Sequence, residues 1–298
     1  MQAAPLHLSA PRLPDAGAIM ERSGGENFSV AARVLSRSHR RHLLAVYGFA
    51  RLADELGDEH SGDRLVALDW LEGELDRAYA GGARHPLLRS LQATISECDL
   101  PREPLVRLIE ANRQDQRVTR YQTWEQLRDY CELSANPVGE LVLGVFGLLT
   151  PERIALSNRV CTALQLAEHL QDVREDVLRG RLYLPAADLA RFGCSHEQLI
   201  VLIEGGERRG DRSGMRKGAY AHSHGSQDER ERLRKVISFE TARARKLLQA
   251  GVALVHSVPG RPKLALAAFV AGGRAASTRL QRAVRPPARP RPIPGDLA

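Results

Sequence analysis

Apolar residues recur every three or four positions along most of this chain, with polar or charged residues between them. This spacing gathers apolar side chains on one face of an α-helix. Breaks at Pro, Gly and acidic residues separate the periodic segments. The predicted helices cover residues 27–36, 39–57, 63–80, 86–97, 103–118, 123–148, 151–178, 195–204, 229–256 and 261–283. Strands do not alternate with helices, so we expect an all-α fold.

Two of the predicted helices are apolar around most of their circumference. Within residues 158–178 the apolar positions are Val160, Ala163, Leu164, Leu166, Ala167, Leu170, Val173 and Val177, and the polar stripe between them is Gln165, Glu168, Asp172 and Asp176. Within residues 39–57 and the residue that follows, the stripe is Tyr47, Arg51, Asp54 and Asp58. Helices of this kind are largely buried. Each of the two therefore carries one polar stripe into the interior.

Composition supports a helical protein with a sizeable core. The chain has 298 residues, of which 43% are hydrophobic and only 5% aromatic, and Ala, Leu and Arg outnumber β-branched residues. Its four cysteines form no C-x-x-C pair, and no secretory signal precedes them, which predicts a reducing, cytoplasmic location: they are Cys98, Cys131, Cys161 and Cys194. No apolar run is long enough to span a bilayer, so any membrane contact is expected to be peripheral.

The net charge of +7 suits an anionic partner such as phosphate or acidic lipid. Much of this charge falls in residues 207–235, which we interpret as a mobile insertion, and in the Pro/Arg-rich segment 284–298, interpreted as a disordered tail. Residues 1–22 are expected to be a flexible extension, which leaves 23–283 as one helical domain. Because this body shows no basic face interleaved with aromatics, we expect no nucleic-acid partner.

The two polar stripes each contain a D-x-x-x-D pair, Asp54/Asp58 and Asp172/Asp176. Either pair alone is more simply an exposed helix turn in water. Two pairs on largely apolar helices are harder to explain that way, because buried carboxylates one turn apart repel and need a cation. Mg²⁺ with oxygen ligands, shared with substrate phosphates, would supply that charge.

Three ordered segments resemble the motifs of the squalene/phytoene synthase family. "VYGFARLADELGDE" (46–59) and "LQLAEHLQDVREDVLRGRLYLP" (164–185) resemble its two aspartate-rich motifs. "YCELSANPVGELVLGVFG" (130–147) resembles the Tyr-Cys…Val-Gly-Glu segment that lies between them. The resemblance extends from about residue 24 to 283 and implies an isoprenoid synthase fold, a single helical domain around a central apolar cavity.

The resemblance also implies roles for individual residues. The Mg²⁺ ligands and catalytic carboxylates that it implies are Asp54, Asp58, Asp172 and Asp176, with Glu55 and Glu168 as further metal ligands beside them. The diphosphate-binding residues that it implies are Arg51, Asn27, Gln165, Arg181 and Tyr183. Tyr130 would be a catalytic residue near the reacting carbons. For three positions a structural role stays open. Arg51 could form a simple ion pair with Asp54, the Tyr130 hydroxyl could be satisfied by backbone, and His169 is more readily a structural residue than a base that directs water.

Within the family, "GGENFSVAARVL" (24–35), "SANPV" (134–138) and "EHLQDV" (168–173) are similar to the hydroxysqualene synthases of the hopanoid pathway. This similarity implies conversion of presqualene diphosphate and water to hydroxysqualene and diphosphate, at a peripheral membrane surface and alongside other enzymes of that pathway. The alternatives are a head-to-head prenyl transferase that condenses two prenyl diphosphates, and a non-catalytic protein that binds prenyl lipids in an assembly.

Overall fold

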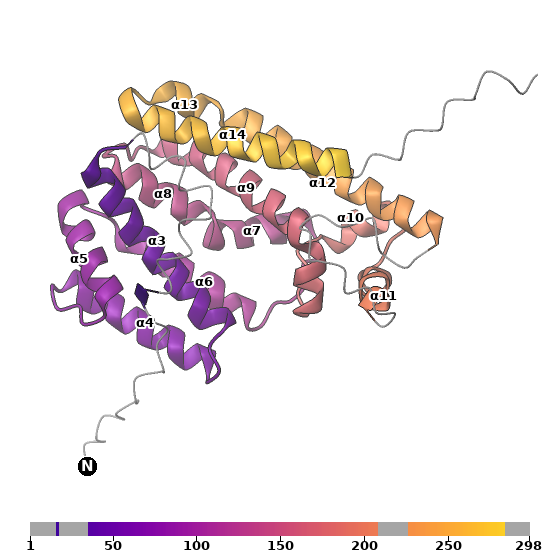
Figure 1. The fold of residues 1–298 in the computed structure, drawn as a ribbon, viewed down its shortest axis with the longest axis horizontal. Helices are drawn as coiled ribbons and strands as arrows, with labels where there is room; N and C mark the ends of the chain where they lie inside the picture. The colour runs from indigo at the N-terminus through magenta and orange to yellow at the C-terminus, as the bar shows by residue number, and fades with distance from the viewer. Residues whose placement is uncertain (1–15, 18–34, 208–225, 284–298) are drawn as a thin grey trace, which may run out of the picture.

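The computed structural model describes residues 16–17, 35–207 and 226–283, and regular structure in these ranges is helical (Figure 1). The helices are α3 (Arg37–Asp58), α4 (Arg64–Tyr79), α5 (Pro86–Cys98), α6 (Arg102–Asp115), α7 (Trp124–Ser134), α8 (Asn136–Val145), α9 (Pro151–Leu178), α10 (Ala186–Arg191), α11 (His196–Glu207), α12 (Gln227–Gly251), α13 (Ala253–Ser257) and α14 (Gly260–Ala283). The described ranges contain no strand, only an isolated parallel bridge between Arg120 and Leu182. The predicted all-α class is confirmed.

Short polar residues begin several of these helices. The Ser36 hydroxyl accepts a hydrogen bond from the His39 backbone N–H at 3.1 Å, and Thr150 caps α9 just before a proline in its first turn. At α12 the Ser226 hydroxyl and the Glu229 carboxylate satisfy each other's backbone N–H groups. Such caps pair N–H groups that a helix leaves open at its start, so local sequence sets where the site-bearing helices begin.

Three predicted boundaries need correction. The helix expected at 123–148 is two helices, α7 and α8, because Pro137 has no N–H and its ring disfavours helical geometry before it. The helix expected at 229–256 is divided at Val252 into α12 and α13. The short helix α10 has no counterpart in the prediction. Of the helix expected at 27–36, only the last two residues are described, and they precede α3.

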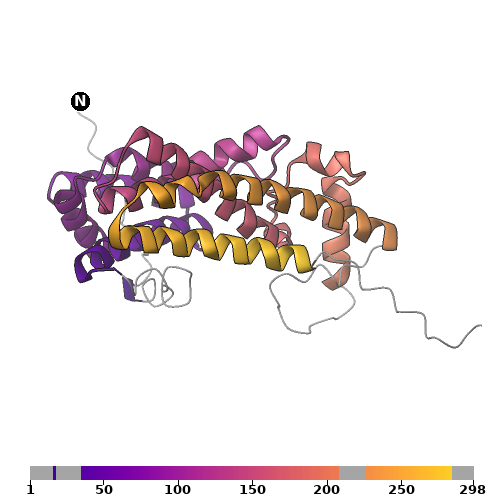
Figure 2. The same ribbon diagram turned by 90° about the horizontal axis from the view of Figure 1, so that it is seen from above.

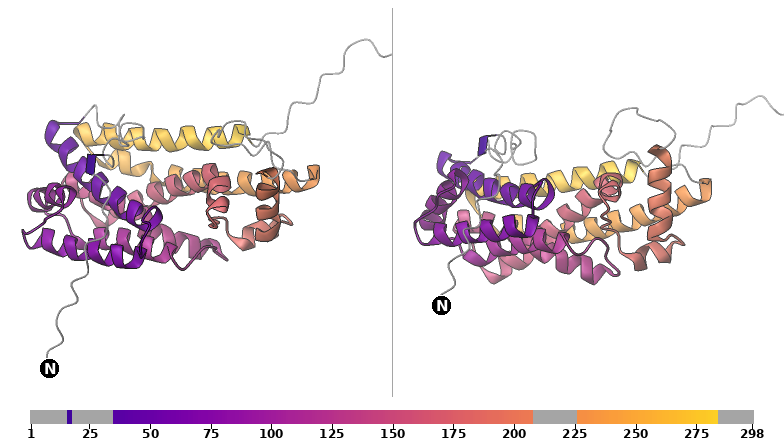
Figure 3. Two further views of the ribbon diagram at one scale, coloured as in Figure 1. Left: turned by 60° about the horizontal axis from the view of Figure 1, so that its bottom comes forward. Right: turned by 90° about the horizontal axis from the view of Figure 1, so that it is seen from below.

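The long helix α9 lies at the centre of the described fold. It packs along much of α12, and it also contacts α7, α8, α11, α13 and α14. Helices α12 and α14 run side by side along one face (Figure 2). Helix α3 instead packs on α4, α5, α6 and α8, at the opposite end from α10 and α11 (Figure 3). Seven of the eight apolar positions predicted from Val160 to Val177 are buried and the eighth, Leu164, is half-buried, as the sequence predicts for a helix apolar around most of its circumference.

The apolar core has two main parts that meet beside the polar stripes. One unites α3 to α6 with α8 and includes Leu52 and Leu56 of α3. The other surrounds the second half of α9 and includes Leu170, Val173 and Val177. At the boundary between the two parts, the carboxyl-terminal ends of α3 and α6 contact the segment that follows α9, through Asp58 with Arg181 and Asp115 with Tyr183.

A buried ionic cluster ties α10 to α12 behind this boundary. The Arg243 guanidinium donates to Asp188 at 2.8 Å and to Glu240 at 2.6 Å, and it lies 4.5 Å from the ring centroid of Trp124. Burial raises the pKa of Glu240 to about 8. One guanidinium thus lies between two carboxylates and holds α10 against α12. The segment between α9 and α10, which carries part of the site, ends at this anchored helix.

Residues 1–15, 18–34, 208–225 and 284–298 lie outside the described part of the chain. Most of the predicted N-terminal extension, most of the predicted insertion and the predicted tail fall there. Residues 227–235 of the predicted insertion instead form the start of α12. None of the described helices has the length and apolar character needed to cross a membrane.

Candidate active site

Asp54 occupies the last full turn of α3 and faces α6. The Asn112 side-chain amide donates to its Oδ1 at 3.3 Å, and burial raises the pKa of Asp54 to about 6. Even so, 53% of its side-chain surface remains exposed. Protein thus surrounds this carboxylate while solvent still reaches its oxygens, which is the setting a ligand-binding carboxylate requires.

Gly57 allows the close approach of Asn112 to α3. A Cβ at position 57 would lie 2.2 Å from Asn112 Oδ1, nearer than two atoms can pack. The carbonyl of Gly57 also accepts a hydrogen bond from Gln116 at 3.0 Å. Only glycine fits this contact between the two helices.

Gly57→Ala is therefore expected to displace Asn112 and to lower the free energy of unfolding by about 1 to 3 kcal/mol, the usual range for overpacking. Gly73→Ala is the matched control, because it lies within α4 and a Cβ there meets only the end of Arg77 at 4.0 Å. That change is expected to stabilise by about 0.5 to 1 kcal/mol. Urea unfolding of both variants measures the difference, and equal effects would contradict the packing argument.

Asp58 joins α3 to the segment that follows α9. Arg181 Nη1 donates to Asp58 Oδ1 at 2.6 Å. The backbone around Arg181 is held because the N–H of Leu182 donates to Thr119 at 2.9 Å and that of Ala186 donates to Tyr121 at 3.0 Å. The first acidic motif thus contacts the residues after the second motif.

Asp115, at the end of α6, was not among the residues predicted from sequence. It accepts hydrogen bonds from the Tyr130 hydroxyl at 2.7 Å and the Tyr183 hydroxyl at 3.1 Å. Burial raises its pKa to about 6, against the lowering effect of these bonds and of the nearby Arg181. The sequence feature that could have revealed Asp115 is its spacing of three residues from Asn112 on a helix with an apolar face. A search for D-x-x-x-D pairs does not find this feature.

Tyr130 and Tyr183 belong to a stacked aromatic cluster. Their ring centroids lie 5.5 Å apart, and the His169 ring stacks on Tyr183 at 3.9 Å. The hydroxyl of Tyr130 is satisfied by the Asp115 carboxylate, not by backbone as the structural alternative held. The polar ends of these aromatic side chains are thus fixed at the boundary between the two core parts.

His169 is held from both sides on α9. Its Nε2 lies 3.2 Å from the Gln165 amide nitrogen, and its Nδ1 lies 3.9 Å from Asp176. Burial lowers the pKa of His169 to about 3, so the ring is neutral. When the Gln165 amide donates to Nε2, the ring proton sits on Nδ1 and faces Asp176. The hydrogen bond to Gln165 and the burial of a neutral ring favour the structural role.

Asp176 is a strongly perturbed carboxylate of the second motif. Burial first and the charge of Asp172 second raise its pKa to about 7, while Arg179 and Arg181 oppose the shift. Only 18% of its side-chain surface is exposed. A carboxylate that two arginines do not fully compensate has room for a further cation.

The remaining predicted residues fall into three groups. Arg51 Nη1 lies 4.0 Å from Asp54, and its buried Nε has no hydrogen-bond partner in the part of the chain described. Glu168 is exposed and Glu55 half-buried, and both interact with neighbours. Asn27 lies outside the described residues.

The carboxylates suit Mg²⁺ in chemistry, although no ready-made cage is present. Within the described ranges no group of three or more His, Cys, Asp or Glu side chains is arranged to hold a metal. Asp54 and Asp176 nevertheless have raised pKa values, each increased further by a neighbouring carboxylate. This excess negative charge is what a hard cation relieves, and Mg²⁺ usually completes its shell with water and substrate phosphate. The residues present therefore fit the ion.

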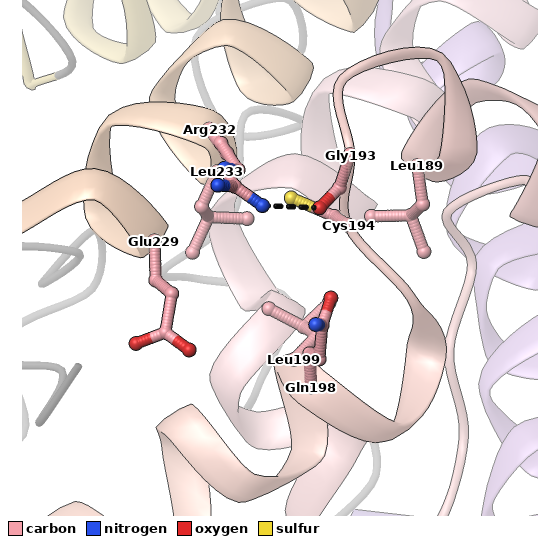
Figure 4. A pocket seen from close by; sticks show the side chains of 8 residues that line it. All are labelled: Leu189, Gly193, Cys194, Gln198, Leu199, Glu229, Arg232 and Leu233. Carbon is pink, nitrogen blue, oxygen red and sulfur yellow. Dashed lines mark hydrogen bonds between the residues drawn. The ribbon is translucent and has the colours of Figure 1, made fainter. Parts of the chain in front are cut away.

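A hollow elsewhere offers less chemistry. It lies where α10, α11 and α12 meet and is lined largely by apolar groups (Figure 4). Its Arg232 donates to the Gly193 carbonyl at 3.1 Å and pairs with Asp228, and its Glu229 completes the cap of α12. Because these polar side chains serve internal contacts, the hollow is structural.

Comparison with known proteins identifies the family of this chain. The model of the squalene/phytoene synthase family matches residues 22–293. The crystal structure of squalene synthase HpnC from Alicyclobacillus acidocaldarius is 43% identical, with a TM-score of 0.76 over 89% of this chain and 91% of that one.

Two curated relatives match a shorter segment. Hydroxysqualene synthase of Sinorhizobium fredii is 35% identical over 178 residues, which are 58% of this chain and 60% of the relative. Chloroplastic phytoene synthase of Narcissus pseudonarcissus is 32% identical over 185 residues, 59% of this chain and 44% of the relative. The chain thus spans about half to three fifths of the length of these relatives.

Proposed function

This chain belongs to the squalene/phytoene synthase family, an enzyme family of isoprenoid synthesis, and we propose that it is a Mg²⁺-dependent hydroxysqualene synthase. The proposed reaction converts presqualene diphosphate and water to hydroxysqualene and diphosphate. It assigns catalysis to the helical domain within residues 23–283. The similarity to the Sinorhizobium enzyme supports this choice within the family.

The observation that carries the proposal is the meeting of both acidic motifs around one cation. Arg181 pairs with Asp58 of the first motif at 2.6 Å, and its charge acts on Asp176 of the second. An arginine placed between two acidic motifs can donate to the negative oxygens of a diphosphate, and a metal held by the carboxylates would bind the same oxygens. The proposal accordingly makes Arg51 and Arg181, with Gln165 and Tyr183 nearby, the diphosphate-binding residues.

Asp54, Asp58, Asp172 and Asp176, with Glu55 and Glu168 beside them, would hold the metal. Bound there, Mg²⁺ would neutralise the charge that develops on the departing diphosphate. The arginines hold the same group in place. In the proposed reaction the carbon–oxygen bond to diphosphate breaks and both its electrons leave with the diphosphate.

The carbon skeleton would react beside Tyr130. The resulting cyclopropylcarbinyl cation rearranges, water adds through its oxygen to the positive carbon, and the added water loses one proton to solvent. Tyr130 and Tyr183 present stacked rings and hydroxyl oxygens to a positive charge, while Asp115 fixes those hydroxyls. His169, whose Nε2 is held by Gln165, orients Tyr183 by stacking.

Product analysis tests the proposal. Purified protein is incubated with Mg²⁺ and presqualene diphosphate in water enriched in oxygen-18, and the lipid extract is analysed by mass spectrometry. We expect hydroxysqualene that carries the heavy oxygen, and no product when EDTA removes the metal. Unconsumed presqualene diphosphate would refute the function.

Farnesyl diphosphate as the only substrate separates the rival activities. The similarity to a phytoene synthase favours the head-to-head prenyl transferase as the second candidate. Formation of a C30 product from farnesyl diphosphate would establish that transferase. Binding of prenyl diphosphate without turnover would instead indicate the non-catalytic assembly protein.

A further inference from the structure

The carboxyl-terminal part of the helical body carries a one-sided charge. Residues 241–283 contain eight Arg or Lys and no Asp or Glu, although the whole chain has a net charge of only +7. Seven of the eight are exposed, and they are Arg245, Lys246, Arg261, Lys263, Arg274, Arg279 and Arg282. We call these seven the basic face. The expectation that the charge resides mainly in 207–235 and the tail overlooks it, because its residues are dispersed along two helices.

The fold brings part of the basic face together. Helices α12 and α14 lie side by side, and their opposite faces are buried through residues such as Leu248 and Leu280 (Figure 2). An open hollow between the two helices is lined by Arg245, Lys246 and Arg274. Three cations of the basic face thus meet at this hollow, and the other four are exposed elsewhere along α14.

These cations lack the carboxylate partners that arginines have elsewhere in the structure. Arg113 pairs with three carboxylates and Arg102 with two. Arg245 and Arg274 instead donate to the neutral amides of Gln281 at 2.7 Å and Gln249 at 3.0 Å. Among described residues, no carboxylate oxygen lies within 4.0 Å of a cationic nitrogen of the basic face. Carboxylates of the described residues therefore do not neutralise its charge.

We propose that the basic face docks this protein onto the surface of an anionic phospholipid bilayer. Exposed cations on two helices that lie side by side can meet several headgroup phosphates at once, and each such residue near the membrane surface favours binding. Leu264, which is 56% exposed between Lys263 and the core of α14, adds an apolar contact at one end. Aromatic side chains that would stack on nucleic-acid bases do not line the hollow.

Vesicle co-sedimentation tests this docking without reference to catalysis. The full chain is mixed with vesicles of phosphatidylcholine alone or with added phosphatidylglycerol. We expect binding only to the anionic vesicles, weakening as NaCl rises. The double variant Arg245→Glu/Arg274→Glu is expected to bind them about tenfold more weakly or worse. The control Arg89→Glu/Arg128→Glu makes the same change of charge at exposed positions of α5 and α7 and should bind as the wild type does.

Several outcomes would overturn the proposal. These are equal binding by both double variants, equal binding to neutral vesicles, or retention on duplex DNA with no binding to anionic vesicles. Displacement by inorganic phosphate beyond that caused by NaCl of equal ionic strength would show a site for free phosphate instead. Thermal unfolding checks that the variants are folded. If Arg245→Glu/Arg274→Glu is not folded, Arg245→Gln/Arg274→Gln replaces it in the binding assay, because this variant removes the two charges without reversing them.

Discussion

Asp176→Asn is expected to lower turnover of presqualene diphosphate by about 10³-fold, the upper range for loss of one group that stabilises charge in a transition state. The substitution removes a negative charge that the proposed Mg²⁺ requires, and it keeps the shape of the side chain. Its carboxylate is 18% exposed, and burial and the charge of Asp172 raise its pKa to about 7. Initial rates at saturating Mg²⁺ measure the effect.

The same variant should not lose stability, and this separates a functional role from a structural one. A raised pKa means that ionised Asp176 costs the folded state free energy, and this cost grows as pH rises from about 4, its unfolded value, through about 7. The variant does not incur it. In metal-free buffer its Tm relative to the wild type should therefore be higher at about pH 8 than at about pH 5. A lower Tm at both pH values, or full activity, would contradict the assignment.

Asp115→Ala is expected to lower turnover by about 100-fold. A shift of about 1 Å in a side chain that positions the substrate can have an effect of this size. It removes the acceptor of the Tyr130 and Tyr183 hydroxyls, which bond to it at 2.7 Å and 3.1 Å. Since Asp115 acts through these side chains, kcat should fall more than KM rises. Steady-state kinetics with presqualene diphosphate measures both.

Asp115→Asn and Tyr130→Phe supply the control. The amide oxygen of Asn still accepts one hydrogen bond, so Asp115→Asn should retain more activity than the Ala variant. Asp115 and Tyr130 share one hydrogen bond. The double variant Asp115→Ala/Tyr130→Phe should therefore lose less activity than the product of the two single losses predicts. Fully multiplicative losses would show that Asp115 and Tyr130 act separately.

The candidate site was predictable in part. The D-x-x-x-D pairs identify Asp54, Asp58, Asp172 and Asp176, because regular spacing on an apolar helix is visible in one dimension. Asp115 was missed because its importance arises from partners 15 and 68 residues away along the chain. The division of α7 from α8 was missed although Pro137 marks it, since apolar periodicity continues across the break.

The sequence by itself determined the helical class, the largely buried character of α9 and the two polar stripes, because these depend on neighbours three or four residues apart. Only the tertiary structure decided that Arg181 joins Asp58, that Asp115 holds two tyrosines, and that cations of α12 and α14 meet at one hollow. Those contacts join residues far apart in the chain. They depend on how the helices pack against one another. Close approaches such as that of Gly57 to Asn112 permit this packing, and the local spacing of residues does not encode it.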